Sequence, residues 1–367
     1  MSPLSPSQEQ AINNIRSSAE LQRAEANEII HHVLRMSNLL PPAATHASLL
    51  ATIAQTSRVA IHFHPDRPAG DKTVVQHLIA DGVYRNQFET NISNGGLSAS
   101  PGGARDEWER ALFGSAYHAG GQDKDWRAHR PKYGALDLLG HAADGPAPRF
   151  GSCFFVLDPS VLWRCTFTFG GSQDLPRWRG TVHEFDGLLA AVLEESFVRE
   201  SALGLIGGLR PPELVARILA RGAGGQVAGK ELSRNLDHYI EAQIHGEVGL
   251  GRDVERLVAD PSFRDTETGR DLVALSNRFG FPLRWHPGLH LEAESVPPDF
   301  RGPTMPSLAA RVARDGVVDA CAIGDGVRQL TSDPGAWRDR GTYEQALQEL
   351  KLLWHVLVRY GKPHHLE

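Results

Sequence analysis

Three polar side chains able to bind ligands or transfer protons alternate along one short segment near residue 240. Glu241, Gln243 and His245 are separated by single apolar residues, which is the period-two pattern of a half-buried β-strand. A carboxylate, an amide and an imidazole side by side on a rigid strand predict a site that lines a cleft. An edge strand whose polar face meets water is the structural alternative.

A second polar cluster, His-Phe-His-Pro-Asp-Arg, occupies residues 62–67. In one interpretation His64 hydrogen-bonds a ribose or an amide, and Arg67 binds a phosphate through both guanidinium nitrogens. In another, His62 and His64 project from one strand face as the first ligands of a metal-dependent hydrolase. These side chains can also simply cap local backbone groups.

The same cluster superficially matches the His-Pro-Asp loop of J-domain co-chaperones. That loop follows a helix rich in Lys and Arg, whereas residues 58–61 here, Arg-Val-Ala-Ile, are strand-like and carry one charge. The sequence therefore disfavours a J-domain.

Residues 84–96 form a third polar-rich stretch that contains Arg85 and ends in Asn-Gly-Gly. A lone arginine in a strand is costly to bury without an anion, and the glycines let backbone N–H groups approach a ligand closely. No Walker or Rossmann glycine pattern is present. Ser172, which follows a strand-like Phe-Thr-Phe-Gly-Gly run, can contact a ligand or cap a turn.

Composition restricts the class of protein. The chain has 367 residues, of which 41% are hydrophobic and 22% charged, as in a globular protein. A net charge of −6 disfavours nucleic acid as a partner, and no apolar run is long enough to cross a membrane. Three cysteines cannot build a disulfide framework, and the first ten residues lack the pattern of a secretory signal.

Hydrophobic periodicity predicts helices and short strands without regular βαβ alternation, so the expected fold class is α+β. Residues 1–55 are expected to form a helical N-terminal extension, and residues 56–367 a catalytic domain that ends in an amphipathic helix over 343–360. The expected strands cover 58–64, 82–88, 150–157, 164–169 and 239–245, and the expected shorter helices cover 72–81, 105–113, 185–200, 212–220 and 253–257.

Seven segments together resemble a bacterial effector family within the ADP-ribosyltransferase superfamily, the CteC-type effectors, over roughly residues 55–330. The segments are HFHPDR (62–67), DGVYRNQFET (81–90), ISNG (92–95), RPKYGALDLL (130–139), RFGSCFF (149–155), TFTFG (166–170) and YIEAQIHGEV (239–248). The resemblance implies a core of two small split sheets that hold NAD as co-substrate, without a metal.

The resemblance also implies roles for individual residues. Glu241 takes the place of the catalytic glutamate. The implied cofactor-binding residues are His64, Arg67, Arg85, Asn86, Ser93, Ser172 and Gln243. The chain has Glu-Ala-Gln at 241–243 rather than Glu-x-Glu, which disfavours arginine as acceptor and favours a hydroxyl.

Members of that family ADP-ribosylate a threonine of ubiquitin, so the resemblance implies ubiquitin as the protein partner. It also implies a bacterial effector that a specialised secretion system delivers from the bacterial cytoplasm into the host cytosol. Two alternatives remain at this point: a metal-dependent hydrolase built on His62 and His64, and a non-catalytic module that binds a partner.

Overall fold

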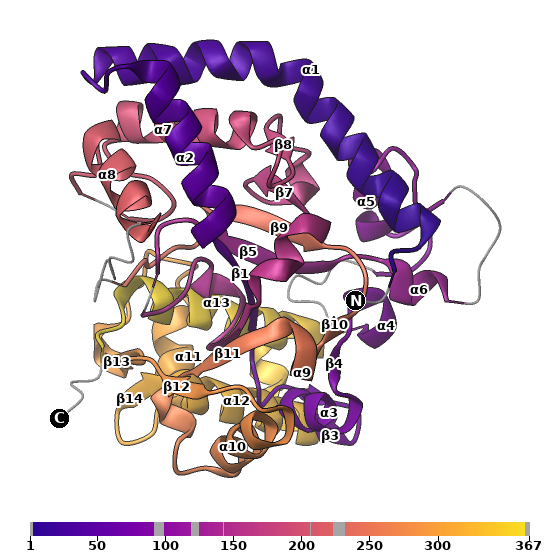
Figure 1. Ribbon diagram of the computed structural model, residues 1–367. Helices are drawn as coiled ribbons and strands as arrows, with labels where there is room; N and C mark the ends of the chain where they lie inside the picture. Colours follow the sequence, from indigo (N-terminus) through magenta and orange to yellow (C-terminus); the bar gives the residue numbers. More distant parts are fainter. Residues whose placement is uncertain are drawn as a thin grey trace.

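The computed structural model describes residues 3–91, 99–118, 125–141, 143–205, 207–222 and 232–363, and all structural statements below refer to these residues. The fold is mixed α+β, built around one large sheet with helices on both sides (Figure 1). The expected α+β class is therefore confirmed. The strands are hydrogen-bonded into one continuous eight-stranded sheet, where two small sheets were expected.

The sheet has the strand order β12-β11-β6-β1-β5-β9-β7-β8, and its pairs are antiparallel except β11 with β12. In this order the strands are β12 (Leu283–Trp285), β11 (Val254–Ala259), β6 (Cys153–Leu157), β1 (Arg58–Phe63), β5 (Lys132–Asp137), β9 (Ile240–Ile244), β7 (Cys165–Phe169) and β8 (Arg179–Gly180). Strands β5 and β9 therefore lie in the interior of the sheet, where both of their edges are paired.

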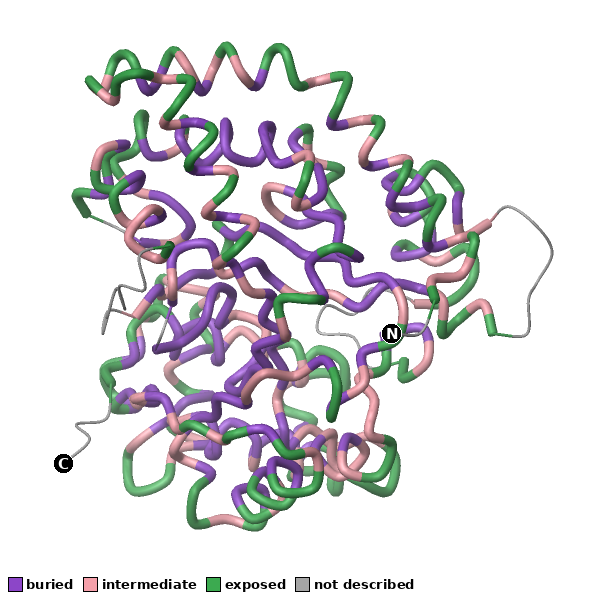
Figure 2. Tube along the Cα trace, viewed as in Figure 1, coloured by how far each residue is buried: buried purple, intermediate pink, exposed green. Residues whose placement is uncertain are grey.

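Two long N-terminal helices form an outer layer at one end of the molecule (Figure 1). Helix α1 (Pro6–Met36) packs along α7 (Asp186–Arg199), and α2 (Pro42–Thr56) packs on α8 (Pro211–Gly222). Figure 2 shows the buried face of α7 beneath α1. The helices expected before residue 56 exist, but their apolar faces belong to the main core. They bury Ile30, Leu34, Leu49 and Ile53 in the same cluster as the sheet.

The other end of the molecule carries a second group of helices around β11 and β12 (Figure 1). These are α3 (Val74–Asp81), α10 (Glu267–Phe279), α11 (Met305–Val312), α12 (Ala320–Ser332) and α13 (Tyr343–Tyr360). The expected helix over 343–360 is α13, and a capping box at Thr342 and Gln345 begins it.

Short elements complete the chain. They are α4 (Gln87–Thr90), α5 (Ala104–Leu112), α6 (Trp126–His129), α9 (Leu250–Asp253), the two-stranded pairs β2 (Pro68–Ala69) with β3 (Lys72–Thr73), β4 (Val83–Tyr84) with β10 (Val248–Gly249), and β13 (His290–Glu292) with β14 (Val317–Asp319), and 3-10 turns at Pro148–Phe150, Pro159–Arg164, Ser172–Asp174, Pro261–Phe263, Ala293–Ser295 and Pro334–Arg340.

Two expected elements are wrong. The strand expected over 82–88 is only β4, because Asn86 caps helix α4 by accepting hydrogen bonds from the backbone N–H groups of Phe88 and Glu89. The helix expected over 253–257 is instead the start of β11. Its residues pair with β6, and this tertiary pairing overrides the weak local helical pattern.

Candidate functional site

A pocket of 670 Å³ opens where β1 ends and β5 begins, between α3 and the β4–α4 segment. This volume falls within the range of small-molecule sites. The pocket is lined by residues from three of the sequence segments singled out above, His62 to Gly70, Asp81 to Thr90, and Lys132 with Tyr133. It brings His64, Arg67, Arg85 and Asn86 of the predicted cofactor-binding residues into one cavity.

Two cations in this pocket make no direct contact with a carboxylate among the described residues, although Asp66 acts electrostatically on Arg67 and Glu89 on Lys132. The guanidinium of Arg67 makes no hydrogen bond and no ion pair there. Lys132 is buried, and its Nζ donates only to the carbonyl of Ala128, at 3.1 Å. Burial lowers the pKa of Lys132 to about 8. A phosphate or carboxylate ligand would supply the charge that both side chains lack.

The other two predicted pocket residues are already engaged. Arg85 is exposed at the rim and forms ion pairs with Asp81 at 2.7 Å and Glu89 at 3.2 Å. Asn86 is buried, and its amide donates to the carbonyls of Arg127 and Arg130 while its oxygen caps α4. All the hydrogen-bonding capacity of Asn86 is used, so this residue shapes the pocket wall.

Glu241 lies on the central strand β9 and is 7% exposed. One carboxylate oxygen accepts hydrogen bonds from the backbone N–H of Ser172 at 3.2 Å and from the amide of Gln243 at 3.0 Å. Burial raises the pKa of Glu241, and hydrogen bonds from Ser172 and Gln243 oppose this rise. The structure thus brings together three predicted residues, Glu241, Ser172 and Gln243.

The polar face of β9 is covered, which corrects the expected half-buried strand. Gln243 and His245 are fully buried, and they form hydrogen bonds with the neighbouring strand β7 and with Tyr117. Period-two alternation predicted the strand correctly. The alternation did not predict the burial, because polar side chains on two neighbouring strands can be buried together when they form hydrogen bonds with each other.

These buried groups form a directed chain of hydrogen bonds that ends at Glu241. The hydroxyl of Tyr117 donates to His245 Nδ1 at 2.5 Å, and His245 Nε2 donates to Thr166 at 3.1 Å. Thr166 donates to the oxygen of Gln243 at 2.9 Å, and the amide of Gln243 donates to Glu241. Burial lowers the pKa of His245 to about 3, so its ring is neutral at pH 7, as this pattern requires.

Tyr133 connects the pocket to the Glu241 carboxylate. Tyr133 is one of the residues that line the pocket, its backbone pairs with Gln243, and the next residue on the same face of β5, Ala135, pairs with Glu241. Directly paired residues project from the same face of a sheet. The carboxylate therefore lies on the face to which Tyr133 belongs, one step further along the strand.

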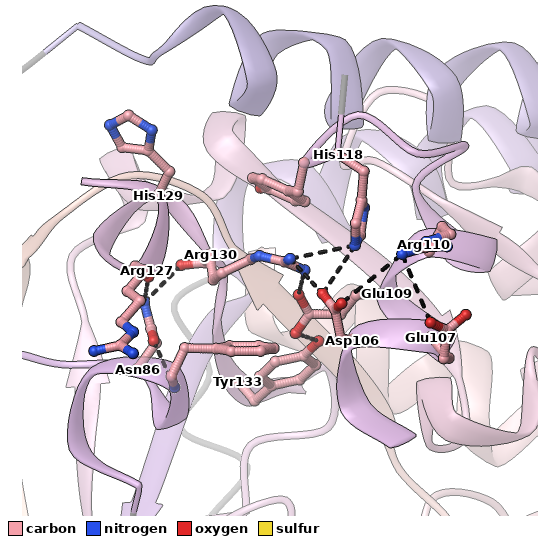
Figure 3. Close-up of polar contacts among 12 residues, drawn as sticks. Asn86, Asp106, Glu107, Glu109, Arg110, His118, Arg127, His129, Arg130 and Tyr133 are labelled. Atoms are coloured by element: carbon pink, nitrogen blue, oxygen red, sulfur yellow. Dashed lines mark hydrogen bonds and ion pairs between the residues drawn. The ribbon is translucent and has the colours of Figure 1, made fainter. Parts of the chain in front are cut away.

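Buried ion pairs hold the wall of helix α5 around this face (Figure 3). The guanidinium of Arg130 contacts the carboxylates of Asp106 and Glu109, and the hydroxyl of Tyr133 donates to Glu109 at 2.7 Å. Arg105 lies over the Tyr133 ring at 4.8 Å, and its Nε is buried without a hydrogen-bond partner among the described residues.

From the sequence, the segment 130–136 was expected to form either a slot for a flat ring or part of the core, but Lys132, Arg105 and Arg130 were given no role of their own. A lysine and a tyrosine that begin an apolar strand were the available signal at 132–137. Ser93, the remaining predicted cofactor-binding residue, lies outside the described residues.

The histidines considered as metal ligands are used structurally. His62 Nδ1 donates to the carbonyl of Gly151 at 3.3 Å, and its Nε2 accepts from the backbone of Ala147 at 3.4 Å. His64 packs its ring against Trp354. Within the part of the chain that the structure describes, no cluster of three or more metal-ligating side chains occurs.

A comparison with protein families matches residues 58–360, from the first residue of β1 to the last residue of α13. The matching family is described as "Protein of unknown function (DUF3626)". The chain belongs to this family. The family's span contains both the 670 Å³ pocket and Glu241, and it begins after α2. No curated protein matches the chain. Among the described residues, no helix combines the length and apolarity needed to cross a membrane.

Proposed function

We propose that this protein is a mono-ADP-ribosyltransferase that uses NAD to modify a hydroxyl group on a host protein. The observation that carries the proposal is the buried carboxylate of Glu241, which does not itself line the pocket but which fixed donors hold on β9, the neighbour of the strand whose first residues line the pocket with Arg67. The sequence resemblance to a split-sheet transferase core and to ubiquitin-modifying effectors supplies the reaction class.

The site's donor set fits a dinucleotide. Arg67 and Lys132 offer two cations that form no direct ion pair among the described residues, which suits a pyrophosphate. Arg105 presents a buried guanidinium nitrogen without a hydrogen-bond partner among the described residues. Two aromatic residues, Tyr84 and Tyr133, are among those that line the same pocket, and aromatic side chains suit a flat base.

Bound NAD would supply an ADP-ribosyl group and a nicotinamide leaving group. Glu241 would stabilise the positive charge that develops on the ribose when the bond to nicotinamide breaks. Gln243 and the backbone N–H of Ser172 would keep this carboxylate in one orientation and favour its ionised form. The new bond forms to the acceptor oxygen, and the acceptor hydroxyl loses its proton.

The acceptor follows from the resemblance alone, so ubiquitin and its threonine are part of the proposal. Export from a bacterium and delivery into a host cytosol are proposed on the same basis. The N-terminal helices α1 and α2 share the core of the domain, which favours their retention in any active protein.

The proposal is tested by incubating the protein with NAD and ubiquitin and measuring the intact mass of ubiquitin. We expect a gain of one ADP-ribose unit, which is absent with Glu241→Gln. Unmodified ubiquitin together with NAD cleavage would overturn the acceptor while keeping the reaction class. The absence of NAD cleavage would overturn the reaction class itself.

A further inference from the structure

Helix α13 presents two basic side chains to the interior of the protein, one helical turn apart. Lys351 and His355 are separated by four residues and so lie on the same face of the helix. Between them in the sequence, Trp354 fixes the position of α13, because its Nε1 donates to the carbonyl of Pro148 at 2.9 Å and its ring packs against His64.

Cations from three other segments act electrostatically on Lys351, and two of them, Arg149 and Arg301, also act on His355. Arg67 follows β1, Arg149 follows Pro148, and Arg301 lies in the loop before α11. Arg149 has an anionic partner, since its guanidinium contacts Asp237 at 2.5 Å. Arg301 packs on the ring of Phe300, and its Nε is buried without a hydrogen-bond partner in the described chain.

Lys351 has no counter-charge among the residues described, and the carboxylate that acts most strongly on Arg67 is that of Asp66. Neither side chain forms a hydrogen bond or an ion pair there, and the carboxylate nearest Arg67 in sequence, Asp66, pairs with Arg328 at 3.2 Å. Three cations thus share a partly buried region in which available carboxylates are already paired. Such an arrangement is unfavourable unless an anion binds between them.

His355 adds an unusual second observation. Its side chain is only 2% exposed, yet both ring nitrogens are buried without a hydrogen-bond partner among the described residues. Leaving a buried polar group without a hydrogen bond is unfavourable, so two such nitrogens in one ring point to contact with a group from outside the chain.

The electrostatics agree with this geometry. Burial, followed by the charges of Arg149, Arg301 and Lys351, lowers the pKa of His355 to about 3. Burial, followed by the same arginines and Arg67, lowers the pKa of Lys351 to about 8. Lys351 and His355 therefore both lie where the surrounding charge is positive.

We propose that Arg67, Arg301, Lys351 and His355 form a binding site for phosphate groups. The site lies between two pockets, because Arg67 lines the 670 Å³ pocket and Arg301 lines another of 510 Å³. The phosphates can belong to a dinucleotide that reaches in from the first pocket or to a separate phosphorylated molecule. The proposal does not depend on ADP-ribosyl transfer.

The test is a calorimetric titration of the full chain with inorganic pyrophosphate. We expect saturable binding by the natural protein and at least tenfold weaker binding by Lys351→Gln and by His355→Gln. Lys362→Gln, which changes an exposed lysine that follows the same helix, is the matched control and should bind like the natural protein.

Thermal melting separates this role from a purely structural one. Without ligand, Lys351→Gln should melt at the same temperature as the natural protein or higher, because it removes an unpaired cation. Pyrophosphate should raise the melting temperature of the natural protein but not that of Lys351→Gln. No binding of pyrophosphate, or equal binding by Lys351→Gln, would overturn the proposal.

Saturation with NAD before the titration distinguishes the two sources of phosphate. Loss of pyrophosphate binding would assign the site to the dinucleotide. Binding of both ligands at once would assign it to a separate phosphorylated molecule. Either result supports a phosphate site. If the protein binds pyrophosphate but does not cleave NAD, the phosphate site is supported and the transferase proposal fails.

Discussion

The amide of Gln243 donates a hydrogen bond of 3.0 Å to the carboxylate of Glu241, two residues away on the same strand. The oxygen of that amide accepts from Thr166 on the neighbouring strand, so Gln243 cannot rotate without losing both bonds. The orientation of the Glu241 carboxylate is therefore fixed by the sheet itself. Rigid support of this kind is what a charge-stabilising group needs.

Replacing Gln243 with Met should lower kcat for NAD cleavage by about tenfold or more, with a smaller effect on KM, since the group acts through Glu241. Loss of a donor to the carboxylate raises its pKa. The acidic limb of the pH–rate profile should then move to higher pH. An unchanged profile with lowered kcat would instead indicate a general packing defect.

Arg130→Met should destabilise the fold by about 3–5 kcal/mol, because it leaves the buried carboxylates of Asp106 and Glu109 without their cation. Arg85→Gln breaks two ion pairs at an exposed guanidinium and should cost only about 0–1 kcal/mol. Urea unfolding of both variants measures the contrast. If the Arg130 and Arg85 variants lost the same stability, the burial of the Arg130 ion pairs would be contradicted.

Arg67→Gln should weaken NAD binding by about tenfold or more, as expected for loss of a hydrogen bond to a charged group. Arg85→Ala should weaken it less, because Asp81 and Glu89 already neutralise that guanidinium. Calorimetry with NAD measures both effects, and Arg270→Gln on the exposed face of α10 serves as the control. If the Arg85 variant lost more NAD affinity than the Arg67 variant, Arg85 at the pocket rim would be the main phosphate-binding residue instead.

Stability should fall on acidification in part because of His62. Burial lowers its pKa from 6.5 to about 3, so the unfolded chain binds a proton that the folded protein excludes. This contribution is complete above pH 6.5 and is lost as the pH falls toward 3. In that window, His62→Gln should reduce the slope of unfolding free energy against pH by up to about 1.4 kcal/mol per unit. If the natural protein and the variant had the same slope of unfolding free energy against pH, His62 would not be a buried neutral side chain.

The sequence predicted several elements because their signals are local. Apolar residues at helical spacing marked α1 and α13, and alternation marked β1 and β9. The signal for α4 was also local but was overlooked, since Asn86 and Glu89 form a capping box.

The rest depended on tertiary contacts that no local pattern encodes. Burial of Glu241 and Gln243 requires hydrogen bonds from the backbone of Ser172 and from Thr166 on β7, and these residues lie far away in the sequence. Arg67 was predicted as a phosphate ligand, but its lack of a partner depends on Asp66 being paired with Arg328, 261 residues away from Arg67 by their numbers. Segment order alone could not indicate which arginine remains unpaired.

The most direct test of the central claim compares NAD cleavage by the natural protein, Glu241→Gln and Glu247→Gln, with folding checked by melting. Glu247 is an exposed carboxylate six residues further along the chain. We predict that Glu241→Gln lowers turnover by about 100-fold or more while Glu247→Gln retains it. Turnover by Glu241→Gln at the natural rate, or no cleavage by the natural protein, would contradict the account.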